Sequence, residues 1–171
     1  MKLNHLLFWV GLTVLSVPGF SQAPLNLNAT ATISTTLSFS GTTTINFGTI
    51  APTAPDQQGS VTVPAVGAVT TVNATANGAS PASITLSGTN GAAFSLTVPG
   101  PAYTLQLSDG NSHNVTISGI TTSLSGTPPA GQLSNLTGNA TFTVGATLAF
   151  TGSQASGTYH NGTIPISVNY N

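Results

Sequence analysis

The sequence has almost no charge and no cysteine. Its 171 residues include no arginine, no glutamate and one lysine, Lys2, and the only acidic residues are Asp56 and Asp109. Charged residues make up 2% of the chain, against roughly 25% in an average globular protein. A nucleic-acid-binding protein needs lysine and arginine to neutralise phosphates, and a coiled coil draws on glutamate, lysine and arginine, so both classes are excluded. Without cysteine, no disulfide can reinforce the fold of an exported protein.

Hydroxyl-bearing and apolar residues dominate instead. The chain contains 29 threonines and 19 serines, and 39% of its residues are hydrophobic. The mean hydropathy is +0.27. This much apolar side chain can supply a core, which argues against disorder driven by charge. A chain of this length has room for one domain of ordinary size.

The N-terminus has the organisation of a secretory signal peptide. Lys2 is a minimal positive region, an apolar run covers residues 6–17, and Pro18 with Gly19 ends any helix. The run is too short for a stable membrane span. We predict a signal peptide over residues 1–21, cut after Ser21, and a single domain over residues 22–171. The protein is then secreted through the periplasm to the cell surface or the medium, with no membrane span after the signal is removed.

After residue 21, apolar residues alternate with polar ones over many short stretches. Good examples are residues 84–86, 94–98, 142–150 and 164–170. Period-two alternation is typical of strands with one buried face, and no stretch has sustained helical periodicity. Four residue pairs accept positive φ in tight turns: Asn77-Gly78, Asn90-Gly91, Asp109-Gly110 and Asn161-Gly162. The fold class predicted from this pattern is all-β, an antiparallel immunoglobulin-like or pilin-like β-sandwich of many short strands.

Three stretches of the sequence resemble a known family. They are Leu37-Ser-Phe39 with residues 45–50, residues 142–148, and residues 154–162 followed by 168–171. Together they resemble the bacterial secreted proteins grouped as domain of unknown function 4402, over nearly all of the mature chain. The resemblance implies a sandwich that is exposed on a bacterial surface or released from it, and it implies no known reaction.

The last strand is similar to the end of chaperone–usher pilins and spore-coat-U-like secreted proteins. Those proteins end in an alternating strand with a penultimate tyrosine and have a glycine about fourteen residues earlier. Tyr170 and Gly157 match these two positions. The chain departs from the pilin pattern in lacking the usual disulfide.

The titratable side chains suggest no reaction. A Ser-His-Asp triad is possible in principle, but no G-x-S-x-G motif occurs. Asp109, His113 and His160 could approach a metal ion, yet a calcium loop needs a further bidentate carboxylate. Asp56 and Asp109 could form a glycosidase pair, although each lies in a turn-rich segment. We expect polar turns at these positions, and no catalytic residue, cofactor or metal site.

Two binding functions remain as alternatives. Tyr103 and Tyr159 are the candidate stacking residues of a monomeric adhesin or carbohydrate-binding module. More remotely, the pairs Thr30/Thr32 and Thr141/Thr143 could form an ice-binding face, although β-branched residues also suit the solvated face of a strand.

The best-supported interaction surfaces are two strands. The first, a candidate subunit-contact strand, alternates apolar residues just after the signal peptide: Leu25, Leu27, Ala29, Ala31 and Ile33. It could add to the sheet of another copy, as in β-augmentation, or form the first strand of its own domain. The second is a candidate strand to accept another subunit or face a chaperone: Ile164, Ile166, Val168 and Tyr170.

Pro165 bears on the last of these strands because it has no N–H. It predicts that the side of the strand to which Thr163, Pro165, Ser167 and Asn169 direct their backbone groups is poorly paired. We therefore expect a structural subunit of a bacterial extracellular fibre or matrix. Its partners would be copies of itself or a periplasmic assembly chaperone.

Overall fold

The computed structural model describes residues 36–100, 105–160 and 162–171. The chain divides into two units, Met1–Thr32 and Ile33–Asn171, and every described residue belongs to the second. The described residues form strands and turns without a helix, and therefore no helix among them could span a membrane. The strands are β1 (Ser38–Thr42), β2 (Thr49–Pro52), β3 (Gly59–Val63), β4 (Thr70–Val72), β5 (Ala74–Asn77), β6 (Ala82–Ser87), β7 (Ala93–Thr97), β8 (Leu105–Ser108), β9 (Asn114–Thr122), β10 (Ala130–Gln132), β11 (Asn139–Phe150) and β12 (Ser167–Tyr170).

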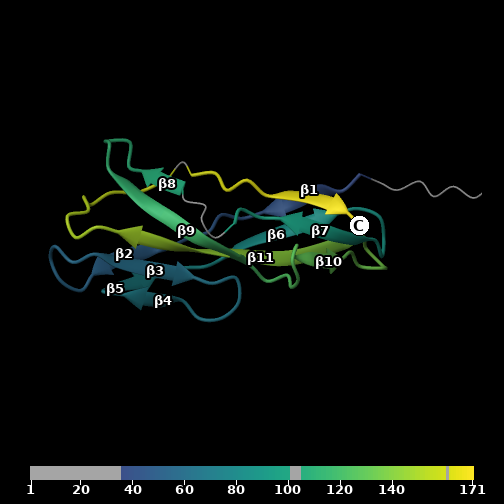
Figure 1. Cartoon of the computed structure of the whole chain (residues 1–171), viewed down its shortest axis with the longest axis horizontal. Coiled ribbons are helices and arrows are strands. Elements are labelled where there is room, and N and C mark those ends of the chain that lie inside the picture. The colour runs from purple at the N-terminus through teal and green to yellow at the C-terminus, as the bar shows by residue number, and fades with distance from the viewer. Residues whose placement is uncertain (1–35, 101–104, 161) are drawn as a thin grey trace, which may run out of the picture. The chain divides into compact units, whose positions relative to one another are not determined.

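The strands form three antiparallel sheets (Figure 1). Seven strands make a curled half-barrel in the order β1-β6-β11-β3-β4, with β9 also pairing β11 and β8 pairing β9. A three-stranded sheet has the order β10-β7-β12, and a two-stranded sheet joins β2 to β5. The prediction of an all-β fold with many short antiparallel strands is confirmed.

The long strand β11 organises the seven-stranded sheet. Val144 pairs with Ala82 of β6 and with Thr122 of β9, so these two strands lie on opposite edges of β11. Thr147 pairs in the same way with β3 and β9. One edge of β11 therefore receives β6 and then β3. Gly145 stands between these two pairings, where a side chain would overlap the backbone of β3 as it leaves the sheet.

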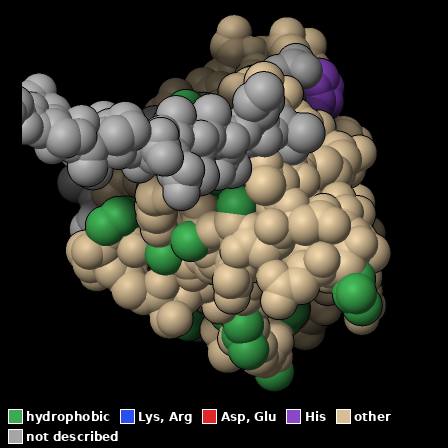
Figure 2. All heavy atoms as spheres, turned by 90° about the vertical axis from the view of Figure 1, so that its right-hand side faces the viewer, with side chains coloured by type: hydrophobic (Ala, Val, Ile, Leu, Met, Phe, Trp, Pro, Cys, Tyr) green, Lys and Arg blue, Asp and Glu red, His purple; other side chains and the backbone are tan. Residues whose placement is uncertain are grey.

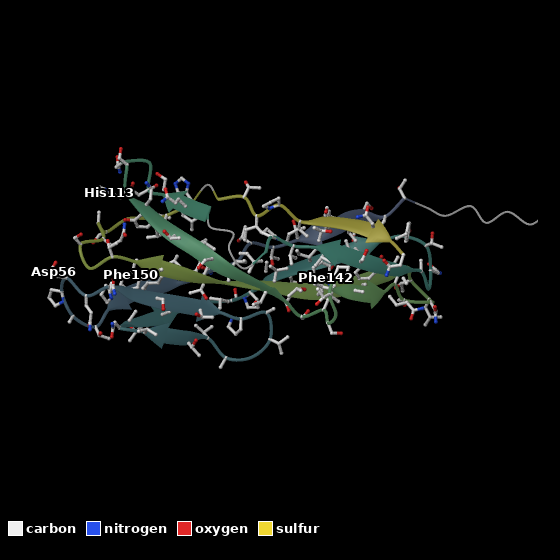
Figure 3. The ribbon with its side chains drawn as sticks, viewed as in Figure 1. Asp56, His113, Phe142 and Phe150 are labelled. Carbon is white, nitrogen blue, oxygen red and sulfur yellow. The ribbon has the colours of Figure 1, made fainter. Side chains whose placement is uncertain are left out.

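Two apolar clusters lie along β11 (Figure 3). The cluster that we call the β7 core contains Phe142 and comprises Ala82, Ile84, Leu86, Phe94, Leu96, Leu133, Phe142 and Val144. The cluster that we call the β3 core contains Phe150 and comprises Phe47, Val61, Val63, Ala74, Val115, Ile117, Ala146, Leu148 and Phe150. Neither cluster contains a polar or charged residue. Apolar packing therefore stabilises both clusters, and no disulfide can reinforce them because the chain has no cysteine.

Threonine and serine side chains bond to one another across the polar face of the seven-stranded sheet. The hydroxyls of Thr85 and Thr141 lie 3.1 Å apart, and those of Thr62 and Thr147 lie 2.9 Å apart. Thr143 donates its hydroxyl to the carbonyl of Ala65 at 2.6 Å. These cross-strand pairs stabilise a sheet and use the hydroxyl groups that an ice-binding face would present. The face drawn in Figure 2 shows scattered hydrophobic side chains and no Lys, Arg, Asp or Glu among its described residues.

The C-terminal strand β12 pairs with β7 through the side that the sequence predicted to be unpaired. Asn171 donates its N–H to the carbonyl of Ala93, and Ser167 and Asn169 stand opposite Thr97 and Ser95. Since backbone groups alternate along a strand, those of Ser167 and Asn169 also face β7. The prediction that this side of the last strand is poorly paired is therefore wrong. Pro165, the next residue of this parity, has no N–H to donate, and the strand begins two residues later at Ser167.

Candidate functional site: an apolar groove between two sheet edges

An apolar cavity opens between the end strand of one sheet and the segment that leads into the end strand of another. β1 is the end strand of the seven-stranded sheet and pairs only with β6, whereas β12 ends the three-stranded sheet and pairs only with β7, as far as the described strands go. The cavity, which we call the edge groove, has a volume of about 480 Å³. Its walls carry Phe39 and Ile45 on the β1 side, Ile164 and Ile166 before β12, and Ile84 and Val144 between them.

A second cavity of about 580 Å³ continues the edge groove toward the β3 core. We call it the loop pocket, because its wall includes the loop of residues 154–159. Phe150 and Leu148 of β11 also line it. The two cavities have four wall residues in common: Ile45, Phe47, Leu107 and Tyr159. They therefore adjoin, and together they follow β11 from Val144 to Phe150.

Residues of the family-like stretches build these walls. In the stretch 45–50, Gly48 has φ of 74°, and its N–H binds the side-chain oxygen of Asn46 at 2.9 Å. A side chain at Gly48 would overlap the carbonyl of Asn77, so this turn requires glycine. In the stretch 154–162, Tyr159 donates its hydroxyl to the carbonyl of Ala155 at 2.6 Å and accepts a bond from Gln154 at 2.7 Å. These bonds hold the Tyr159 ring at the junction of the two cavities.

Tyr170 anchors the end of β12. Its hydroxyl accepts a hydrogen bond from the N–H of Thr89 at 2.7 Å, and its half-buried ring packs against the β7 core. The hydroxyl also lies where a side chain at Gly88 would point. The penultimate tyrosine therefore fixes the last strand to the turn after β6. Ile166 and Val168 are half-buried against the same core, whereas Ile164 contributes to the wall of the edge groove.

Asp109 and His113 organise the turn between β8 and β9. The Asp109 carboxylate lies 2.7 Å from Nδ1 of His113, and it accepts the N–H of Asn111 at 2.7 Å and that of His113 at 3.2 Å. The Asp109 side chain is 5% exposed, and that of His113 is 50% exposed. The His113 side chain, followed by the two backbone donors, lowers the pKa of Asp109 to about 2. The polar turn expected at this position is present, and Asp109 is one of its structural elements.

The Asp109 turn gives a prediction for acid stability. Because folding lowers the pKa of Asp109 from 3.8 to about 2, its contribution to stability is complete above pH 4 and disappears as the pH falls to about 2. We expect the melting temperature to vary little between about pH 5 and 9 and to fall below pH 4. The Asp109→Asn variant should melt below wild type at pH 7 and lose less on acidification. Parallel melting curves for the two proteins from pH 5 to 2 would contradict this role.

Of the other two candidates for a metal or catalytic site, His160 lies beside this turn and Asp56 lies in a separate loop. Asp56 is in the loop between β2 and β3 with φ of 57°, and Figure 3 shows its loop separate from that of His113. The backbone of His160 exchanges two hydrogen bonds with Ser108. Among the described residues, no group of three or more His, Cys, Asp or Glu could hold a metal ion. Tyr103 and the strand from Leu25 to Ile33 lie outside the described residues.

The sequence alone did not reveal the edge groove. Phe39 and Ile45 belong to recognised strands, but their position opposite Ile164 and Ile166 depends on the pairing of residues about 120 positions apart. One feature of the sequence could have indicated it. Phe39 and Ile45 have the alternation of core residues, and the segment around them has no charged residue to protect the edge of a strand.

The comparisons with known proteins identify a family and nothing more specific. A sequence profile described as "Domain of unknown function (DUF4402)" matches residues 26–170. The chain therefore belongs to this family, as the three stretches predicted. No curated protein and no solved structure matches the chain.

Proposed function

We propose that this member of the DUF4402 family is a non-enzymatic, secreted subunit of a bacterial extracellular fibre or matrix, joined to its neighbours by strand addition. The observation that carries the proposal is the edge groove, which lies between β1 and the segment before β12. An added strand gains main-chain hydrogen bonds from a sheet edge and specificity from pockets for alternate side chains. The edge groove has the β1 edge on one side and an apolar floor, and it can therefore provide both.

The lack of charged side chains that would protect these edges supports the same proposal. Soluble proteins commonly shield the edges of their sheets with lysine, inward-pointing charges, bulges or proline. This chain has one lysine, in the predicted signal peptide, and neither aspartate lines the edge groove. β1 does contain an irregularity between Phe39 and Gly41, and Pro165 precedes β12. A bound strand would cover an edge that otherwise favours aggregation.

The proposal also includes an immunoglobulin-like, pilin-like fold and export of the protein to the cell surface or the medium. We interpret the packing of β6 and β11 against β7, with Phe142 and Phe94 in one cluster, as one half of an immunoglobulin-like, pilin-like β-sandwich. The anchored penultimate tyrosine is consistent with a pilin-like C-terminal strand. The leader-like residues 1–21 support export. The use of Asp109 in a structural turn supports a protein without catalytic activity.

A monomeric carbohydrate-binding module is the second candidate. The loop pocket favours it, because about 580 Å³ lies within the range of small-molecule sites and Tyr159 and Phe150 offer aromatic surface.

Negative-stain electron microscopy of the protein purified from its native host distinguishes the two candidates. A subunit should form filaments or a mesh and should run as a ladder resistant to detergent that collapses on boiling. A carbohydrate-binding module should remain monomeric and bind members of a glycan array. A monomer at every concentration that binds glycans would overturn the subunit proposal.

A further inference from the structure

We infer that the occupant of the edge groove and the loop pocket is the segment 25–33 of a second copy of this chain, inserted in trans as one continuous strand. This inference rests on the proposed function and specifies its partner. Three features of the segment support this occupant: its length, its chemistry, and the difficulty of inserting it into its own domain.

The segment is long enough to span both cavities. From Val144 to Phe150 the cavities follow six residue steps of β11, which is about 20 Å of strand. The segment 25–33 has eight steps, or about 27 Å when extended. One strand could therefore reach from the β1 end of the edge groove into the loop pocket. The shared wall residues Ile45 and Tyr159 would lie near its middle.

The chemistry of the segment suits the walls. Residues 25–33 read LNLNATATI, with five apolar side chains of one parity and no charge. The segment contains no proline, so every residue can donate its N–H to a strand edge. The apolar face would contact the floor built by Ile84, Val144 and Leu148. The asparagine and threonine side chains would face water.

Insertion into its own domain is disfavoured by the sequence of the connection. The segment is separated from β1 by only four residues, Ser34–Leu37, which is too short for a parallel crossover. A hairpin would have to turn within those residues, yet residues 29–40 contain no glycine, proline, asparagine or aspartate. The alternation of Leu25 to Ile33 also continues in the same parity through Leu37 and Phe39, which is typical of one extended strand. The segment is therefore suited to the groove of another molecule.

Because the chain has no cysteine, any disulfide in a test must form between cysteines that are introduced. We would place Ala29→Cys at the centre of the segment, so that either direction of insertion leaves it near the middle of the groove. Its partner is Thr44→Cys, an exposed residue that lines the edge groove. The matched control is Leu136→Cys, which is 90% exposed and lines neither cavity. When two variants are mixed, one of them carries a tag that changes its mass. The full chain is exported from bacteria before it is oxidised.

The expected result is a mixed disulfide dimer between the Ala29→Cys and Thr44→Cys chains, and none with the Leu136→Cys chain. A chain carrying both Ala29→Cys and Thr44→Cys should give a ladder of linked copies. An internal disulfide in monomers would overturn insertion in trans. Native polymers without the mixed disulfide would overturn this occupant but leave the subunit proposal standing. Monomers without any disulfide would overturn both.

Discussion

The Gly145→Ala variant is expected to melt at least about 10 °C below wild type, or not to fold at all. Gly145 is buried in the middle of β11, where a Cβ atom would overlap the carbonyl oxygen of Val63 and the backbone nitrogen of Ala65. Both atoms belong to the backbone at and just beyond the end of β3, which cannot move away without disturbing the pairing of Val63 with Ala146. We expect a loss of about 3 kcal/mol or more, at the upper end of what overpacking costs.

The matched control is Gly100→Ala, because a Cβ atom at Gly100 has no heavy atom within 4 Å. Thermal melts of the two variants and the wild type would measure the difference. The control should lie close to wild type. Equal melting temperatures for Gly145→Ala and Gly100→Ala would show that the backbone leaving β3 does not pass Gly145 as closely as described.

The second prediction concerns assembly: replacing both Leu25 and Leu27 by asparagine is expected to abolish polymers without lowering the melting temperature of the monomer. Burial of a leucine contributes about 1.5–3 kcal/mol, so losing two weakens association by about 3–6 kcal/mol. Since 1.4 kcal/mol is a factor of ten, the affinity between subunits should fall at least about a hundredfold. Sedimentation and detergent-resistant ladders would measure the assembly.

Two further variants complete this test. Thr30→Asn with Thr32→Asn changes the opposite face of the same segment and should leave the polymers intact. Deletion of residues 22–28 should also yield monomers that fold normally. Unchanged polymers in the leucine variant would contradict strand addition. Loss of folding in the leucine variant or the deletion would show that the segment is the first strand of its own domain.

Much of the fold could be predicted from the sequence because alternation is a local property. Ile84 with Leu86, and Phe94 with Leu96, were expected on one face of a strand, and all four are buried. A strand needs only period-two patterning and a turn at each end to be recognised. The family stretches could be recognised for a related reason: several of their glycines and polar residues have local steric or hydrogen-bonding roles, as at Gly48 and Tyr159.

Edge assignments failed where they depended on partners far away in the chain. Pro165 correctly indicated an interruption of pairing, but only the register between β12 and β7 shows which side of the strand is involved. Phe39 has the parity of a core residue and is nevertheless 42% exposed, because β1 is an end strand beside the edge groove. Alternation reports which face of a strand is apolar, and carries no information on its lateral neighbours.

The sequence by itself therefore determined the all-β class, most of the described strands and turns, the reliance on an apolar core, and the family. The tertiary structure decided that β11 receives two strands on one edge, that Asp109 is used in a turn with His113, and that β1 and the segment before β12 leave an apolar groove between them. The physical reason is the range of the interactions involved. Side-chain periodicity and turn chemistry act within a few residues, whereas a groove exists only after strands more than a hundred residues apart have been placed side by side.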